Sequence, residues 1–238
     1  GKIRNLEINR AGQEFTLTFH TTLDGNLTIT AGELNTGADW NLIVAGNTHI
    51  VSAGTLTLNA STTTFTGAND SNWAFSNAGT LNGGTGTCNV VYGFSTYVNS
   101  VTVLPRTMNC TGVQFGYPFN ADQGLGTGSW DNNSSTVNIN VGESCNIRMH
   151  ATDSQPFYNL VINAAGYTVY TKSGRPIEVD NNFTITAGTY STDNAGSSGT
   201  TALTVTGQTT INGGELTCND STLTLGVASG VTTPYGLK

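Results

Sequence analysis

The chain repeats itself, and this internal repeat constrains its fold more than any other feature. Residues 5–37 and residues 159–193 share a pattern of apolar residues alternating with Thr or Asn. A duplicated unit of this kind predicts a stacked β architecture, because each unit buries its apolar side against its neighbours. The matched positions are Asn5 with Asn159, Gly12 with Gly166, Ile29–Gly32 with Ile185–Gly188, Leu42 with Leu203, Ile50 with Ile211, and Leu56 with Leu216.

Short strands are expected along the whole chain, and helices are not. No window places apolar residues at helical spacing with good helix formers between them. Strand-like alternation recurs instead between Gly, Asn or Asp residues, and the pairs Ala31-Gly32 and Ala187-Gly188 are expected to be turns. The clearest strand signals are 15–19 (FTLTF), 26–29, 42–44, 55–58 and 201–206.

Two all-β architectures accommodate many short, evenly spaced strands. We expect a parallel β-solenoid (β-helix) of stacked short strands, because the strand–turn units recur almost unchanged. The alternative is a β-sandwich, in which Greek-key connections would make the spacing less regular. Along the chain we distinguish a first β-repeat (1–67), a divergent, aromatic-rich β middle region (68–150), a second β-repeat (151–230) and a short tail (231–238).

The charge of the chain argues against two classes of partner. Only 10% of the residues are charged, against about 25% in a typical soluble domain. The net charge is −7, with 8 basic residues scattered among 15 acidic ones. Nucleic-acid binding needs a basic patch, so no nucleic-acid partner is expected. No apolar run approaches the roughly 20 residues of a membrane-spanning helix, so we expect no membrane insertion.

The cysteine spacing and the search for metal-binding motifs indicate structural cysteines rather than a metal site. No cysteine belongs to a CxxC pair, which argues against zinc. Cys218 stands where the first copy has Leu58, so a small buried side chain is expected, with a disulfide between neighbouring repeats as the alternative. Residues 83–88 (GGTGTC) lack the Asp of the calcium-binding nonapeptide repeat. We expect neither a metal site nor a cofactor. The four cysteines are Cys88, Cys110, Cys145 and Cys218.

Four segments give the chain a resemblance to known repeat proteins. They are WAFSNAGTLNGGTGTCNVV (73–91), FYNLVINAAGYTVYT (157–171), NNFTITAGTY (181–190) and TALTVTGQTTINGGELTCNDSTLTLG (201–226). In these segments the chain resembles the β-strand-repeat proteins of bacterial secreted and cell-surface polypeptides and of phage tails and virions. The resemblance implies an extracellular, cell-surface or virion location and a structural or adhesive role.

Catalytic signals are weak, so we expect no enzyme. A nucleophilic triad needs a histidine, and His20, His49 and His150 belong to no motif, which favours solvent-facing strand positions. Acidic residues stand mostly beside Gly or Asn, as turn residues do. A polysaccharide-degrading β-helix remains an alternative function. Its candidate residues are Arg148, Asp153, Lys172 and Arg175.

The aromatic residues of the middle region have the character of a contact surface. Tyrosine and tryptophan stack on sugar rings and anchor interfaces. We therefore expect a structural protein that self-associates into a homo-oligomeric fibre, coat or spike element, with a carbohydrate-binding receptor or adhesin as a further alternative. Surface glycans would be its partners in that case. The candidate contact residues for a glycan or a neighbouring subunit are Tyr92, Tyr97, Tyr117 and Trp130.

Overall fold

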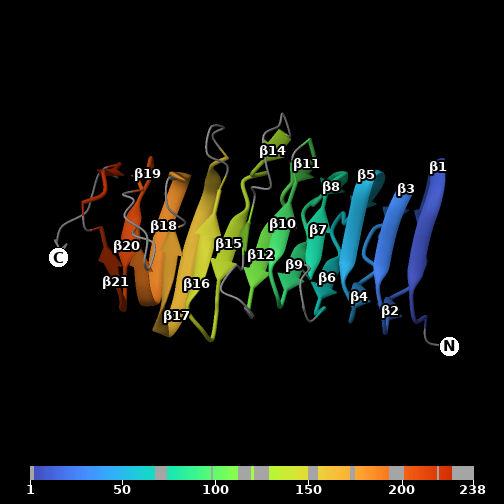
Figure 1. Cartoon of the computed structure of the whole chain (residues 1–238), viewed down its shortest axis with the longest axis horizontal. Coiled ribbons are helices and arrows are strands. Elements are labelled where there is room, and N and C mark those ends of the chain that lie inside the picture. Colours follow the sequence, from blue (N-terminus) through green and yellow to red (C-terminus); the bar gives the residue numbers. More distant parts are fainter. Residues whose placement is uncertain are drawn as a thin grey trace.

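The chain forms a parallel β-solenoid, as the repeat predicts. In the computed structural model, successive turns stack along one axis from β1 to β22 and every strand pairing is parallel (Figure 1). The structure describes residues 3–67, 74–97, 99–111, 119–120, 129–149, 155–171, 175–192, 201–218 and 220–226. Within these ranges there is no helix, and so none that could span a membrane. A β-sandwich, the alternative, is wrong, because its sheets would be antiparallel.

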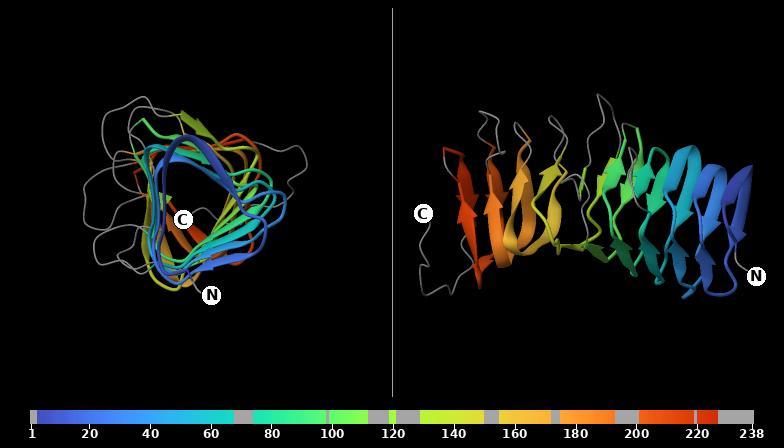
Figure 2. Two further views of the ribbon diagram at one scale, coloured as in Figure 1. Left: turned by 90° about the vertical axis from the view of Figure 1, so that its right-hand side faces the viewer. Right: turned by 60° about the horizontal axis from the view of Figure 1, so that its bottom comes forward.

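The stack has a three-sided cross-section, so each turn contributes to three faces (Figure 2). Pairing between equivalent segments of successive turns builds each face. The first face consists of β2 (Thr21–Leu23), β4 (Leu42–Val44), β6 (Thr62–Phe65), β9 (Thr87–Val90), β12 (Thr107–Cys110), β15 (Thr136–Ile139), the first half of β17 (Phe157–Thr171), the middle of β18 (Ile177–Ser191) and β20 (Thr209–Ile211).

The other two faces share three long strands that bend around a corner. The second face consists of the first parts of β1 (Leu6–Thr16), β3 (Leu27–Asn35) and β5 (Thr48–Thr57), then β7 (Phe75–Asn77), β10 (Phe94–Thr96), β13 (Phe119–Asn120), β16 (Cys145–Arg148), the ends of β17 and β18, and β21 (Gly214–Thr217). The third consists of the ends of β1, β3 and β5, then β8 (Thr80–Asn82), β11 (Val101–Val103), β14 (Ser129–Asp131), the start of β18, β19 (Leu203–Val205) and β22 (Leu223–Leu225).

Alternating residues place one side chain inside the stack and the next outside. Because the turns are in register, equivalent inward residues form columns, such as Leu34, Leu56 and Leu81 on the third face. All three are buried. The core is thus one continuous apolar cluster from Ile8 to Leu216. Strand pairing continues across the boundaries between the three regions distinguished in the sequence, through β5 with β7 and β15 with β17.

Asparagines at one corner explain the spacing of the first repeat. Asn5 Oδ1 accepts the backbone N–H of Asn26 at 2.8 Å, and Asn26 Oδ1 accepts that of Asn47 at 2.8 Å. Glycine precedes both residues that donate their backbone N–H, Asn26 and Asn47, because a Cβ on Gly25 or Gly46 would lie within 2.3 Å of the Asn Oδ1 one turn earlier. This asparagine ladder joins consecutive turns and fixes the corner.

The second copy of the repeat builds the same corner on a different face. Asn159 Oδ1 accepts the backbone N–H of Asn182 at 3.2 Å, as Asn5 does from Asn26. The strand after Asn5 lies on the second face, whereas the strand after Asn159 lies on the first. The duplicated unit is therefore a corner with its flanking strands, and its two copies occupy two different corners of the solenoid.

Two local expectations need correction. The alternation of FTLTF predicted a strand over 15–19, but β1 ends at Thr16 and the chain turns toward the first face before β2. The Ala-Gly pairs expected to be turns are bends inside continuous strands: Gly32 in β3 and Gly188 in β18 have φ of 88° and 79°. The expected tail, 231–238, lies outside the described residues.

Candidate functional site

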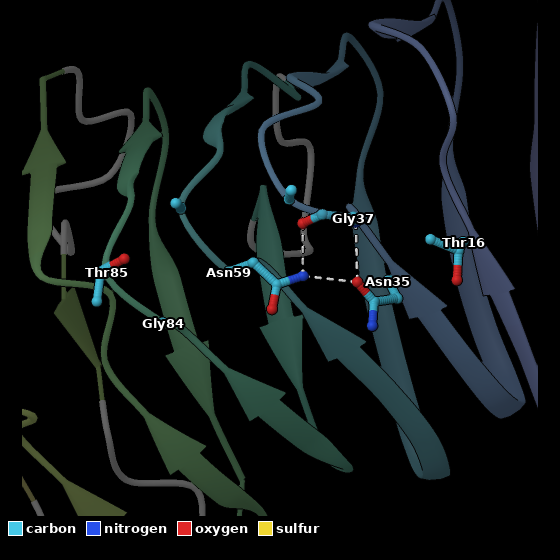
Figure 3. A pocket seen from close by; sticks show the side chains of 8 residues that line it. Thr16, Asn35, Gly37, Asn59, Gly84 and Thr85 are labelled. Carbon is cyan, nitrogen blue, oxygen red and sulfur yellow. Dashed lines mark hydrogen bonds between the residues drawn. The ribbon is translucent and has the colours of Figure 1, made fainter.

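A groove runs along the corner between the third and first faces, over the early turns of the stack (Figure 3). It has a volume of about 530 Å³ and crosses the ends of β1, β3, β5 and β8. Its lining is neutral and small: Thr16, Asn35, Gly37, Ala38, Asn59, Ala60, Gly84 and Thr85.

The amides of this corner groove are occupied by bonds to the protein itself. Asn59 Nδ2 donates to Asn35 Oδ1 at 2.6 Å and to the Gly37 carbonyl at 2.7 Å, and Figure 3 shows these bonds spanning two turns. Asn35 Nδ2 in turn donates to Glu14 Oε1 at 2.9 Å. The groove is therefore mainly a side-chain ladder that ties the turns together, and it offers few free polar groups to a ligand.

A second hollow lies on the outside of the second face, between the corner asparagines and the end of β10. This cleft has a volume of about 300 Å³. His49 and Ser76 are neighbours in the outward column of this face, because β5 pairs with β7 in that register. Tyr97 follows β10 directly. The cleft is lined by Asn26, Thr28, Asn47, Thr48, His49, Ser76 and Tyr97.

The side chains of the Tyr97 cleft are held in place by the turns beneath them. His49 Nδ1 lies 3.1 Å from Ser76 Oγ, which fixes the imidazole ring against the next turn. Tyr97 donates its backbone N–H to the Asn77 carbonyl at 2.8 Å, and its own carbonyl accepts the Ser100 hydroxyl at 2.6 Å. Among the lining side chains that the structure describes, none is acidic and none is a lysine or arginine.

The four aromatic residues proposed from the sequence occupy different environments. Tyr97 lines the cleft. Tyr92 is half-buried and packs against the core. Trp130 occupies an inward position opposite Thr102, packs edge-on against Phe157 with 6.5 Å between ring centroids, and donates its indole N–H to the Pro156 carbonyl at 3.1 Å. Tyr117 lies outside the described residues. The described members thus do not form one surface.

Sequence reasoning missed the neighbours of Tyr97. His49 was interpreted as a solvent-facing strand position, and it is exposed, but it also lines the cleft together with Ser76 and Asn47. His49 and Ser76 are 27 residues apart in the sequence, and this separation is one turn of the solenoid. Only knowledge of the length of each turn would have placed them side by side.

The cysteines are all free in this structure, so the alternative of a disulfide is not found. Cys88, Cys110 and Cys145 are buried in the core, whereas Cys218 is half-buried. Burial raises the pKa of the Cys88 thiol to about 12 from 9.0 and raises those of Cys110 and Cys145 as well. The protonated thiols behave as apolar core side chains and not as nucleophiles.

The candidates for catalysis are not assembled within the described residues. Arg148 lies in β16 and Arg175 precedes β18, while Asp153, Lys172 and His150 lie outside the described residues. His20 accepts the backbone N–H of Asn41 at 3.0 Å and packs edge-on against Trp40. No cluster of three His, Cys, Asp or Glu side chains suited to a metal occurs in the described part of the chain.

The first turn leaves part of the core uncovered. Ile3 and Phe15 are 39% and 40% exposed, although they stand in inward columns. The residues next to them in the same columns, Leu23 and Leu34, are 0% and 1% exposed. Among the described residues, no strand pairs with the outer edge of β1. This end turn therefore presents both apolar side chains and unpaired backbone groups.

Comparisons with protein-family models, with curated proteins and with solved structures found no match to this chain. Its function has to be inferred from its own geometry.

Proposed function

We propose that the chain is a non-enzymatic structural protein of an extracellular, cell-surface or virion assembly, in which its solenoid associates with further copies. The observation that carries this proposal is the uncovered first turn, with Ile3 and Phe15 exposed in columns that are otherwise buried. An open strand edge above an apolar core is a template for strand addition. A second copy that stacks on β1 would bury both features together.

The interior of the stack supports a scaffold role. Continuous apolar columns and side-chain ladders connect each turn to the next, which resists bending between turns. The sparse charge of the chain, 10% of its residues, also reduces electrostatic repulsion between copies.

The test is the molar mass of the protein by light scattering after size exclusion, measured over a range of concentrations. We expect the wild type to populate dimers and longer species as concentration rises. Phe15→Ser is expected to weaken this association about tenfold or more, because it places a hydroxyl in the apolar contact. The matched control is Ile43→Ser, which changes an equally exposed apolar residue on the side of the stack.

A monomer at every concentration would contradict the proposal. So would association that Phe15→Ser and Ile43→Ser weaken equally, because the contact would then lie on the flank. Circular dichroism of each variant verifies that the β fold is intact before masses are compared.

A further inference from the structure

We infer that the Tyr97 cleft is a binding site for a neutral saccharide. The cleft combines one aromatic ring with hydroxyl, amide and imidazole groups from four consecutive turns. This inference does not depend on end-to-end association, since the cleft lies on the side of the stack and the proposed contact lies at its end.

The shape of the cleft suits a small ligand. Its volume of about 300 Å³ is at the lower end of the range for small-molecule sites, which corresponds to one or two sugar rings rather than a peptide or nucleotide chain. The tyrosine ring offers a flat apolar surface on which the C–H face of a sugar ring packs. Because backbone bonds to Asn77 and Ser100 hold Tyr97 on both sides, little ordering of this residue is needed on binding.

Several polar atoms of the cleft lack a protein partner. Asn47 Oδ1 accepts no hydrogen bond, but it is buried against the next turn, where a Cβ on Gly67 would lie 2.5 Å from it, so a ligand in the cleft does not reach it. In the described part of the chain, the Tyr97 hydroxyl and His49 Nε2 also have no partner. The Tyr97 hydroxyl and the His49 imidazole can therefore each form a hydrogen bond with a ligand hydroxyl, at about 0.5–1.5 kcal/mol for each bond.

The chemistry of the described lining favours hydroxyl groups over charged ligands. Among the described lining residues, no lysine or arginine is present to pair with a phosphate, sulfate or carboxylate, and no carboxylate is present to pair with an amine. Sugar hydroxyls both donate and accept, as this mixed set of groups requires. The contact between His49 and Ser76 serves binding rather than hydrolysis, since Ser76 is buried and no carboxylate in the described part of the chain orients the imidazole ring.

The experiment is a screen of the folded chain on an array of neutral and acidic oligosaccharides, followed by titration calorimetry with the best neutral one. We expect a neutral glycan to bind, Tyr97→Ala to weaken it about tenfold or more, and Tyr97→Phe to keep most of the affinity because the ring remains. His49→Ala is expected to weaken binding to a smaller extent. The matched control is Tyr167→Ala, which removes an exposed tyrosine outside the cleft.

Three outcomes would overturn the inference: no neutral glycan bound, tighter binding of acidic glycans, or binding that Tyr97→Ala leaves unchanged. The Tyr97 variants change a half-buried side chain at the surface, so loss of the fold is not expected. If light scattering shows wild-type association for the same variants, a failure of binding is separated from a failure of the structural proposal.

Discussion

Two glycines separate the cost of backbone conformation from the cost of crowding between turns. Gly12 and Gly32 lie one turn apart at the same corner, and both have positive φ, 72° and 88°. A Cβ on Gly12 would meet nothing within 4 Å. A Cβ on Gly32 would lie 2.3 Å from the Arg10 carbonyl of the previous turn. In the second copy, Gly166 and Gly188 repeat this contrast.

Gly12→Ala is therefore expected to cost only the left-handed conformation, about 1–2 kcal/mol. Gly32→Ala carries that cost and a steric clash with fixed backbone, which adds about 1–3 kcal/mol. Chemical unfolding of the two variants measures the difference in stability. Equal destabilisation would mean that adjacent turns do not approach as closely as this geometry requires.

The buried thiols make the fold sensitive to high pH. Burial raises the folded-state pKa of Cys88 from 9.0 to about 12, so above pH 9 the unfolded chain releases this proton and the folded chain keeps it. The free energy of unfolding therefore falls as pH rises through this window, by up to about 1.4 kcal/mol per pH unit for this thiol. Below pH 9 the thiol is protonated in both states and this contribution is constant.

Cys88→Val keeps an apolar side chain of similar size and removes the titrating group. We expect its stability to fall less steeply than that of the wild type between pH 9 and 11, as measured by urea unfolding at several pH values. Cys218→Val, at a half-buried position, is the control and is expected to change the slope less. A wild-type slope for Cys88→Val would show that the thiol is not buried.

Strands of this protein are joined by side-chain ladders as well as by backbone pairing. On the first face, Asn109 Nδ2 donates to Asn89 Oδ1 at 2.8 Å, and Asn138 Nδ2 donates to Asn109 Oδ1 at 2.8 Å. These asparagines sit opposite one another in β9, β12 and β15. Stacked Asn residues therefore explain why a chain with so few charges uses amides on its outer surface.

Asn109→Ala removes two of these bonds from the middle of a ladder. At about 0.5–1.5 kcal/mol for each hydrogen bond, the expected loss is about 1–3 kcal/mol. Amide hydrogen exchange should accelerate in β9, β12 and β15 and stay unchanged in β19 and β22, because each turn contacts only its neighbours. The control, Asn163→Ala, removes a single exposed bond to Asn140. Uniform acceleration along the stack would contradict this local account.

Much of the architecture was predictable from the sequence, because the repeat reports directly on stacking. The β-solenoid and the outward position of His49 follow from repetition and alternation, whereas Cys218, expected to be buried, is half-buried. The Tyr97 cleft was not predictable, because it joins His49, Ser76 and Tyr97 from successive turns of unequal length. Trp130 was predicted wrongly in part. Its aromatic character indicated a contact surface, but its strand register places its side chain inward, against the core.

At the scale of the whole molecule, the turns stack into a rod, and the first turn that the structure describes exposes apolar side chains of the kind found in its interior. Ile3 and Phe15 continue buried columns, and β1 has an unpaired edge within the described part of the chain. Both features would be buried if another copy added its strands to this edge. The proposed end-to-end association would use the same stacking that joins the turns inside one chain.

Negative-stain electron microscopy of the purified protein at increasing concentration tests this claim most directly, with Phe15→Ser imaged alongside. We predict rods whose lengths are multiples of a single solenoid, and a return to single rods in the variant. Single rods at every concentration, or rods joined side by side in both proteins, would contradict end-to-end association.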